Sequence, residues 1–190
     1  MGLINVLGMD PSLRNWGLAA GQYDTSNGML IINRLGLTNP VLPTGKQVRQ
    51  NSKDIEAARQ LSLGAQEFLP GVQAVFVEVP VGSQSSRAMA SYGVCVGVLG
   101  ALRAQGIPFF EVTPNEVKLA AVGKKTASKR EMIQWAYDMH PTANWPFYTK
   151  NGQTVISEAK AEHMADAIAS IHAGIAGNEF QQMLSVLRAA

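Results

Sequence analysis

The sequence has one cysteine, no long apolar run and almost no excess of charge of either sign. Cys95 has no partner for an intramolecular disulfide or a zinc site, so disulfide scaffolds and zinc fingers are excluded, and we expect it to be a buried apolar residue. No apolar stretch approaches the ~20 residues of a membrane span. Asp10 and Arg14 interrupt the apolar start, so no signal peptide is expected. These absences predict a protein of a reducing, cytoplasmic compartment without membrane contact.

The net charge is only +2, from 16 basic and 14 acidic residues, so a nucleic-acid partner must be argued from local clusters of charge. Hydrophobic residues make up 46% of the 190 positions, which is enough for a sizeable core. A chain of this length is normally one domain. We predict a single domain over residues 1–190, with 175–190 as a C-terminal helical extension.

Apolar β-rich segments come first and then alternate with amphipathic ones. Strands are predicted over 3–9, 16–23, 29–37, 73–79 and 107–112. Helices are predicted over 47–68, 84–105, 114–121, 128–139, 158–173 and 179–187. The Asn27-Gly28 pair signals a hairpin, whereas 140–157 is expected to be irregular. The element order βββαβαβα predicts an α/β fold, a mixed five-stranded sheet flanked by helices.

Acidic residues stand at the ends of two predicted strands and on one later helix. Asp10 ends the first strand, Glu78 ends the fourth, and His163 and Asp166 lie three residues apart on one helix face. Singly, Asp10 could be a turn residue and the helical pair could face solvent. If the first and fourth strands are neighbours, all four side chains can meet. Two divalent ions held there would suit phosphodiester hydrolysis, and carboxylates are the ligands that Mg²⁺ prefers.

Four segments resemble the RuvC family, in that family's order. VLGMDPSLRNWGLA (6–19) is similar to its opening motif, and FVEVPVGSQSSRAMASYGVCVG (76–97) to its second acidic strand and the following helix. FEVTPNEVKLAAVGKKTASKREM (110–132) is similar to its valine-lysine segment and basic helix start. AEHMADAIASIHA (161–173) is similar to its last acidic motif. The resemblance covers roughly residues 4–173.

The resemblance implies an RNase H-like, homodimeric endonuclease that nicks Holliday junctions or related branched DNA with two Mg²⁺ ions, for which Mn²⁺ can substitute. It implies that Asp10 bridges the metals, that Glu78 binds one metal or orients the water, and that His163 and Asp166 complete the site. Many relatives have aspartate at the position of His163. An imidazole is a softer ligand that favours Mn²⁺, and it could instead act as a general base.

Basic residues cluster in the third of these segments. Lys118 and Lys129 match lysines of the family near its active site, and Lys124, Lys125 and Arg130 enlarge the cluster. The plain interpretation is a solvated loop and helix end. Five basic residues within 13 positions favour contact with DNA phosphates.

The chain departs from the family in two places. Many relatives have an aromatic residue shortly after the second acid, which wedges into the junction, whereas the matching residue here is Val81. Segment 140–157 and the helix beyond 175 exceed the family core. Trp145, Phe147 and Tyr148 could stack on bases or pack onto the body. These departures favour a phage or mobile-element member.

Other interpretations remain open from the sequence. An actin-type or heat-shock-type ATPase also opens with a strand, an aspartate and a turn, but it needs a second, similar domain. A YqgF-like RNase H-fold protein shares the opening motif, but it would not be expected to match the GSQSSRAMASYGVCVG helix segment (82–97). A branched-DNA-binding module without catalysis is the third alternative. Metal-dependent nicking separates the enzyme from the binding module, and ATP turnover identifies the ATPase.

Overall fold

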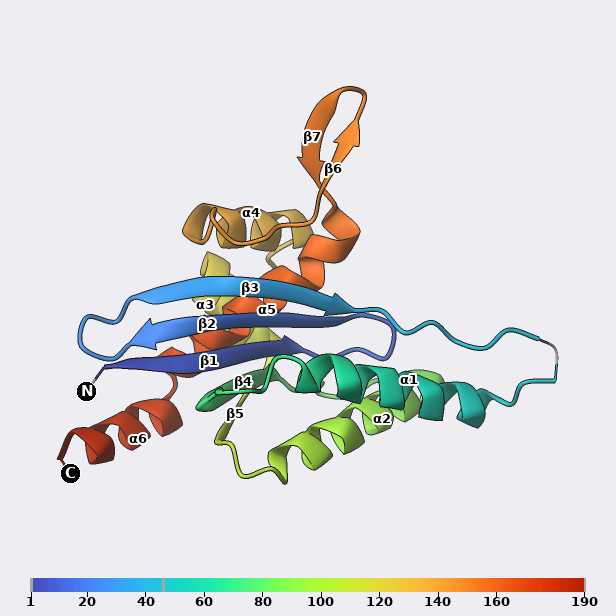
Figure 1. The fold of residues 1–190 in the computed structure, drawn as a ribbon, viewed down its shortest axis with the longest axis horizontal. Helices are drawn as coiled ribbons and strands as arrows, with labels where there is room; N and C mark the ends of the chain where they lie inside the picture. Colours follow the sequence, from blue (N-terminus) through green and yellow to red (C-terminus); the bar gives the residue numbers. More distant parts are fainter. Residues whose placement is uncertain (1, 46, 190) are drawn as a thin grey trace.

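A five-stranded mixed sheet forms the centre of the molecule (Figure 1). The computed structural model describes residues 2–45 and 47–189. The strands are β1 (Leu3–Asp10), β2 (Trp16–Asp24), β3 (Leu30–Thr38), β4 (Ala74–Glu78) and β5 (Phe109–Val112), in the spatial order β3-β2-β1-β4-β5. β1, β2 and β3 form an antiparallel meander, and β1, β4 and β5 run parallel. The predicted sheet, with its first and fourth strands adjacent, is confirmed.

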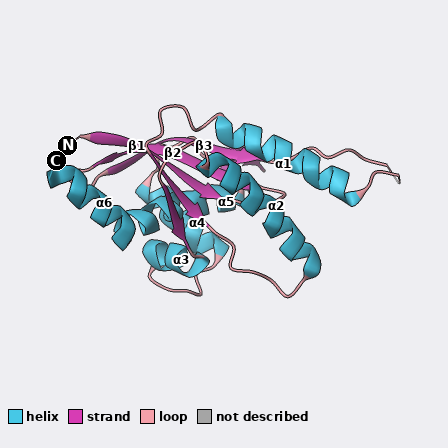
Figure 2. Ribbon diagram, turned by 90° about the horizontal axis from the view of Figure 1, so that it is seen from below, coloured by secondary structure: helices cyan, strands magenta, loops and turns pink. Residues whose placement is uncertain are grey.

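Helices cover both faces of this sheet. α1 (Gln50–Gln66) and α2 (Ser86–Arg103) pack on one face, below the sheet in Figure 1 and side by side in Figure 2. α5 (Glu158–Ala176) crosses the other face and carries α3 (Pro114–Val122) and α4 (Lys129–Met139), and α6 (Asn178–Ala189) follows α5. None of the described helices is both long and apolar enough to cross a bilayer.

The strands build a core on each side because consecutive side chains point to opposite faces. In β1, Val6 packs in the core beneath α5, whereas Leu7 and Met9 pack in the core beneath α1 and α2. All three side chains are completely buried. The continuous apolar run before Asp10 is therefore a central strand covered on both faces, and it holds Asp10 at the rim of the sheet.

Two glycines allow α5 to lie very close to the sheet. A Cβ atom on Gly8 would stand 2.0 Å from the carbonyl oxygen of Ala167, and one on Gly17 would stand 1.9 Å from that of His163. Gly17 is also the cross-strand partner of Asp10 in the β1–β2 ladder. The glycine in the opening motif thus brings the backbone of His163 down beside Asp10.

The prediction that 140–157 is irregular was wrong for its second half. β6 (Phe147–Lys150) and β7 (Gln153–Ile156) form an antiparallel hairpin that projects beyond the N-terminal end of α5 (Figure 1). Its turn is Asn151-Gly152, with φ angles of 50° and 76°. Asn-Gly is the preferred pair for a two-residue hairpin turn because both residues tolerate positive φ. The same signal was used at 27–28 and overlooked here.

Candidate active site

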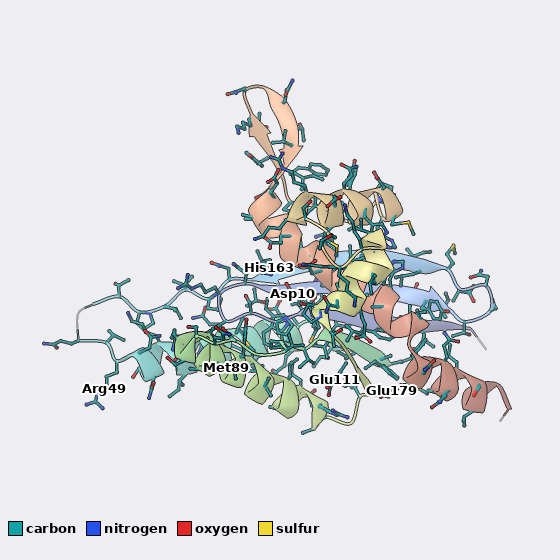
Figure 3. The ribbon with its side chains drawn as sticks, turned by 180° about the vertical axis from the view of Figure 1, so that it is seen from behind. Asp10, Arg49, Met89, Glu111, His163 and Glu179 are labelled. Atoms are coloured by element: carbon teal, nitrogen blue, oxygen red, sulfur yellow. The ribbon has the colours of Figure 1, made fainter. Side chains whose placement is uncertain are left out.

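Asp10 and His163 are in direct contact at the rim of the sheet (Figure 3). Nδ1 of His163 lies 2.5 Å from Oδ2 of Asp10, and the two side chains are only 19% and 13% exposed. Asp10 comes from the end of β1 and His163 from the second turn of α5. The structure therefore brings together two candidate residues that are 153 positions apart in the sequence.

Glu78 lies at the end of β4, the strand beside β1. Burial, and after it the negative charge of Asp10, raise the pKa of Glu78 to about 8, with Lys118 partly opposing the rise. A carboxyl group is normally held neutral only where water and cations are kept away. Glu78 is thus a partly buried acid whose charged form is disfavoured, and Lys118 compensates for this only in part.

Asp166 lies one turn after His163 on α5 and has a similar environment. Burial, followed by the negative charges of Asp10, Glu78 and Glu162, raises the pKa of Asp166 to about 8, and His163 opposes part of this rise. Glu78 and Asp166 line the same cavity of about 210 Å³. The four predicted residues thus form one electrostatically coupled group.

His163 responds to these acids in the opposite sense. Burial disfavours the charged imidazolium, but the hydrogen bond to Asp10 and the charges of Asp10, Glu162 and Asp166 outweigh burial and raise the pKa of His163. A protonated His163 donates from Nδ1 to the Asp10 carboxylate. When His163 is protonated this contact is an ion pair, in which the imidazolium charge offsets that of Asp10.

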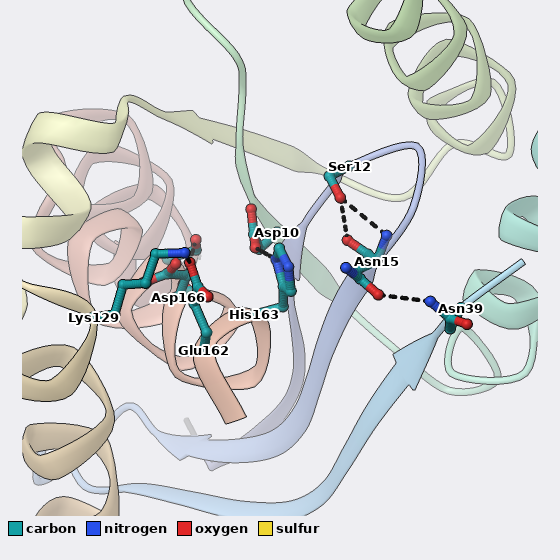
Figure 4. Close-up of polar contacts among 9 residues, drawn as sticks. Asp10, Ser12, Asn15, Asn39, Lys129, Glu162, His163 and Asp166 are labelled. Atoms are coloured by element: carbon teal, nitrogen blue, oxygen red, sulfur yellow. Dashed lines mark hydrogen bonds and ion pairs between the residues drawn. The ribbon is translucent and has the colours of Figure 1, made fainter. Parts of the chain in front are cut away.

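Glu162 is a fifth candidate that sequence reasoning missed. Its carboxylate accepts a contact of 2.6 Å from Nζ of Lys129, the first residue of α4 (Figure 4). Glu162 and Lys129 line the cavity of Glu78 and Asp166. The available signal was position alone, because Glu162 directly precedes His163 in the last acidic motif. Lys129 therefore contacts this acid, and its predicted phosphate contact is untested.

Ser12 fixes the turn that follows Asp10. Its hydroxyl donates to the carbonyl of Asn15 over 2.6 Å and accepts from the amide of Asn15 over 3.0 Å. Asn39, just beyond β3, donates to Oδ1 of Asn15 over 2.7 Å (Figure 4). These bonds tie the turn to the meander and limit the movement of the rim next to Asp10.

The predicted basic cluster is largely paired with acids. Lys124 forms an ion pair with Glu131, and Nε of Arg130 lies 3.0 Å from Glu158. Lys118 faces inward and lines the cavity with Glu78, whereas Lys125 is exposed. Three of the five predicted DNA-binding residues, Lys124, Lys129 and Arg130, thus already have carboxylate partners, so the surface is less positive than the sequence indicates.

The side chains at the rim are of the kind that a hard divalent cation prefers, but they are not arranged to hold one. Four carboxylates and one imidazole gather at one rim, and two of the carboxyl groups carry strongly raised pKa values. Yet across residues 2–45 and 47–189 no group of three or more His, Cys, Asp or Glu side chains is arranged to hold a metal ion. Nδ1 of His163 and Oδ2 of Asp10 are engaged with each other in this arrangement.

The aromatic residues of segment 140–157 differ in how far they are buried. Trp145 is buried and donates its Nε1 hydrogen to the carbonyl of His140 over 2.9 Å, so it packs onto the body. Phe147 and Tyr148 are 48% and 46% exposed. Val81, at the position where many relatives have an aromatic residue, is 76% exposed and carries no ring to insert.

The chain is similar to RuvC proteins in sequence and fold. RuvC of Prochlorococcus marinus, named a crossover junction endodeoxyribonuclease, is 29% identical over 132 residues, which are 68% of this chain and 79% of that protein. The structure of Thermus thermophilus RuvC matches with a TM-score of 0.61 at 21% identity, and the structure of the same protein with a Holliday junction substrate matches with 0.59 at 20%. Each match covers 90% of this chain and 92% of the other. No family model matches the chain. The predicted resemblance to RuvC and the predicted fold are confirmed.

Proposed function

With a sequence and a fold similar to those of RuvC as the premise, we propose that this chain is a metal-dependent endodeoxyribonuclease that cuts Holliday junctions or related branched DNA. One observation carries the proposal. Asp10, Glu78, His163 and Asp166 meet at one rim of a RuvC-like sheet, and two of their carboxyl groups have pKa values raised to about 8. Buried acids that repel one another gain stability when a cation binds between them.

The four residues would hold two divalent ions, Mg²⁺ or in its place Mn²⁺, which would activate water and neutralise the charge of the leaving oxygen. The chain's own groups do the rest. Asp10 holds the His163 ring in place through Nδ1. In its neutral form, the His163 imidazole would be able to bind metal or accept a proton. Lys118, which lines the cavity, would contact a phosphate.

A homodimer belongs to the proposal because a four-way junction presents two symmetric strands for cleavage. Support comes from an unfilled face of α2. Cβ atoms added to Gly93, Gly97 and Gly100 would meet nothing within 4 Å, and the nearby side chains of Met89 and Val96 are about half exposed. A helix face of this kind suits close packing against a second helix.

A branched-DNA-binding module without catalysis is the second candidate. The observation that favours it is the closed Asp10–His163 pair, together with the lack of a ready three-ligand metal group among the described residues. In that case the acids would have a structural role at the rim and no catalytic one. The two candidates differ in whether any strand is cut.

The test is an assay with a labelled, immobile four-way junction and a linear duplex of matched length, each with Mg²⁺, Mn²⁺ or EDTA. Asp10→Asn and Glu78→Gln run beside the wild type. We expect symmetric paired nicks in the junction, reduced to background by EDTA and by both substitutions. Binding without cleavage in either metal would select the binding module, and neither binding nor cleavage would exclude a DNA function.

A further inference from the structure

We propose that the β6–β7 hairpin is a DNA-contacting arm, which stacks Tyr148 on a base and places Lys150 against the backbone of the branched DNA beside the active site. The inference rests on the proposed function, because it takes branched DNA to be what the rim binds. It adds a contact that lies outside the segments resembling RuvC, since those segments are 6–19, 76–97, 110–132 and 161–173.

The hairpin concentrates the exposed aromatic surface of the protein. Of the large hydrophobic side chains exposed in the described part of the chain, only Phe147 and Tyr148 are aromatic. Both belong to β6. Exposed aromatic rings on a projecting element are suited to stacking, because every base offers a π-face whatever its sequence.

The two aromatic rings lie on opposite faces of the hairpin and have different environments. The ring of Phe147 packs edge-on against Tyr137 of α4, with centroids 6.3 Å apart. The ring of Tyr148, by contrast, has no hydrogen bond or ring contact within the described residues. Phe147 therefore anchors the hairpin to the body, and Tyr148 is available to a ligand.

Strand register places the polar groups on the same face as Tyr148. Tyr148 is opposite Val155 and Lys150 is opposite Gln153, so all four side chains share one face of the ribbon. This face offers a ring, an ammonium group and an amide within two cross-strand pairs. The combination suits a nucleotide, which presents a base, a phosphate and hydrogen-bonding edges.

The charge of the segment fits an anionic partner. Residues 140–157 include no aspartate or glutamate, and Lys150 is their only residue with a permanent positive charge. Next to the rim, Lys129 and Arg130 already have acid partners, whereas no ion pair of Lys150 is found across 2–45 and 47–189. An apolar protein partner would require a wider hydrophobic face than one tyrosine and one valine provide.

The hairpin stands beside the candidate active site and is held firmly. The amide of Ser157 donates to the carbonyl of Pro146 over 2.9 Å and closes the base of the ribbon. His163 follows five residues after the first residue of α5, about 7.5 Å along the helix axis. Four-residue strands reach about 13 Å past that base. DNA held at the rim is thus within reach of the arm.

The experiment measures junction binding and cleavage by Tyr148→Ala and Lys150→Ala. Binding is measured in the Asp10→Asn background, so it does not depend on turnover. Thr149→Ala, on the face away from Tyr148, is the matched control, and Tyr148→Phe tests whether a ring alone restores what Tyr148→Ala loses. Thermal unfolding of each variant reports on folding.

We expect Tyr148→Ala to bind the junction roughly 5-fold to 150-fold more weakly, the range for loss of one base–aromatic stack, and Tyr148→Phe to restore binding. Lys150→Ala should reduce the slope of log affinity against log salt by about 1. If Tyr148→Ala and Lys150→Ala bind and cut like wild type, the arm does not contact DNA and the inference fails while the proposed function stands. If wild type neither binds nor cuts the junction, both fail.

Discussion

Glu78 and Asp166 are acids whose charged form is disfavoured in the folded protein. Burial raises the pKa of each to about 8, whereas the ordinary values are 4.5 and 3.8. At pH values between the ordinary pKa values and about 8, the folded chain binds more protons than the unfolded chain. The stability of the metal-free protein therefore depends on pH through the protonation of these two residues. A bound cation would change both their protonation and the stability.

We predict that the metal-free protein loses stability as pH rises through this range. The stabilising contribution of both acids is complete below their unfolded pKa values and is lost as pH rises through about 8. Denaturant unfolding in EDTA between pH 6.5 and 9 measures the effect. In Glu78→Gln the decline should be shallower, and added Mg²⁺ should stabilise wild type most at high pH. Parallel profiles for the two proteins would show that Glu78 is not held protonated.

In the packing of helices against the sheet, Gly17 determines how closely α5 approaches. We predict that Gly17→Ala destabilises the fold by about 1–3 kcal/mol, the usual cost of overpacking, because the new methyl group collides with the backbone of His163. Urea unfolding measures the loss. The shift should also reduce cleavage more than it reduces junction binding.

The matched control is Gly2→Ala, where an added Cβ meets nothing within 4 Å and which lies outside the proposed dimer face of α2. An alanine at this exposed position should leave the free energy of unfolding nearly unchanged. Equal effects of the two substitutions would contradict the proposed role of Gly17.

The sequence predicted the elements that repeat a strong pattern and missed those that depend on context. The apolar run before Asp10 and the β-branched run before Glu78 are buried strands, as predicted. The β6–β7 hairpin was missed because its strands are exposed and lack apolar alternation, although Asn151-Gly152 marked its turn. The turn residues were a more informative signal there than hydrophobic periodicity.

Side-chain pairing was the less predictable part of the site. The shared rim of Asp10 and His163 followed from strand order and helix spacing. The ion pairs of Lys129 with Glu162 and of Arg130 with Glu158 could not be predicted, because they join α4 to α5 through rotamers and helix packing. A cluster of basic residues in sequence therefore overstated the positive charge of the folded surface.

For the molecule as a whole, we predict a dimer that uses the open face of α2. Gly97→Arg should make it monomeric in sedimentation velocity while the unfolding midpoint is retained, because nothing in the protomer lies within 4 Å of the new Cβ. Leu63→Arg, at an exposed position of α1, is the control and should remain dimeric. A wild-type protein that sediments as a monomer at micromolar concentration would contradict the prediction.

The contact between Asp10 and His163 joins segments separated by 153 positions, one in the first strand and one in the last long helix. During translation, β1 and the meander leave the ribosome long before α5 is made. No nascent chain that lacks α5 can assemble the full set of candidate ligands, and a proteolytic fragment that has lost α5 cannot either. A chain that ends before α5 therefore lacks His163 and Asp166, two of the four candidate ligands.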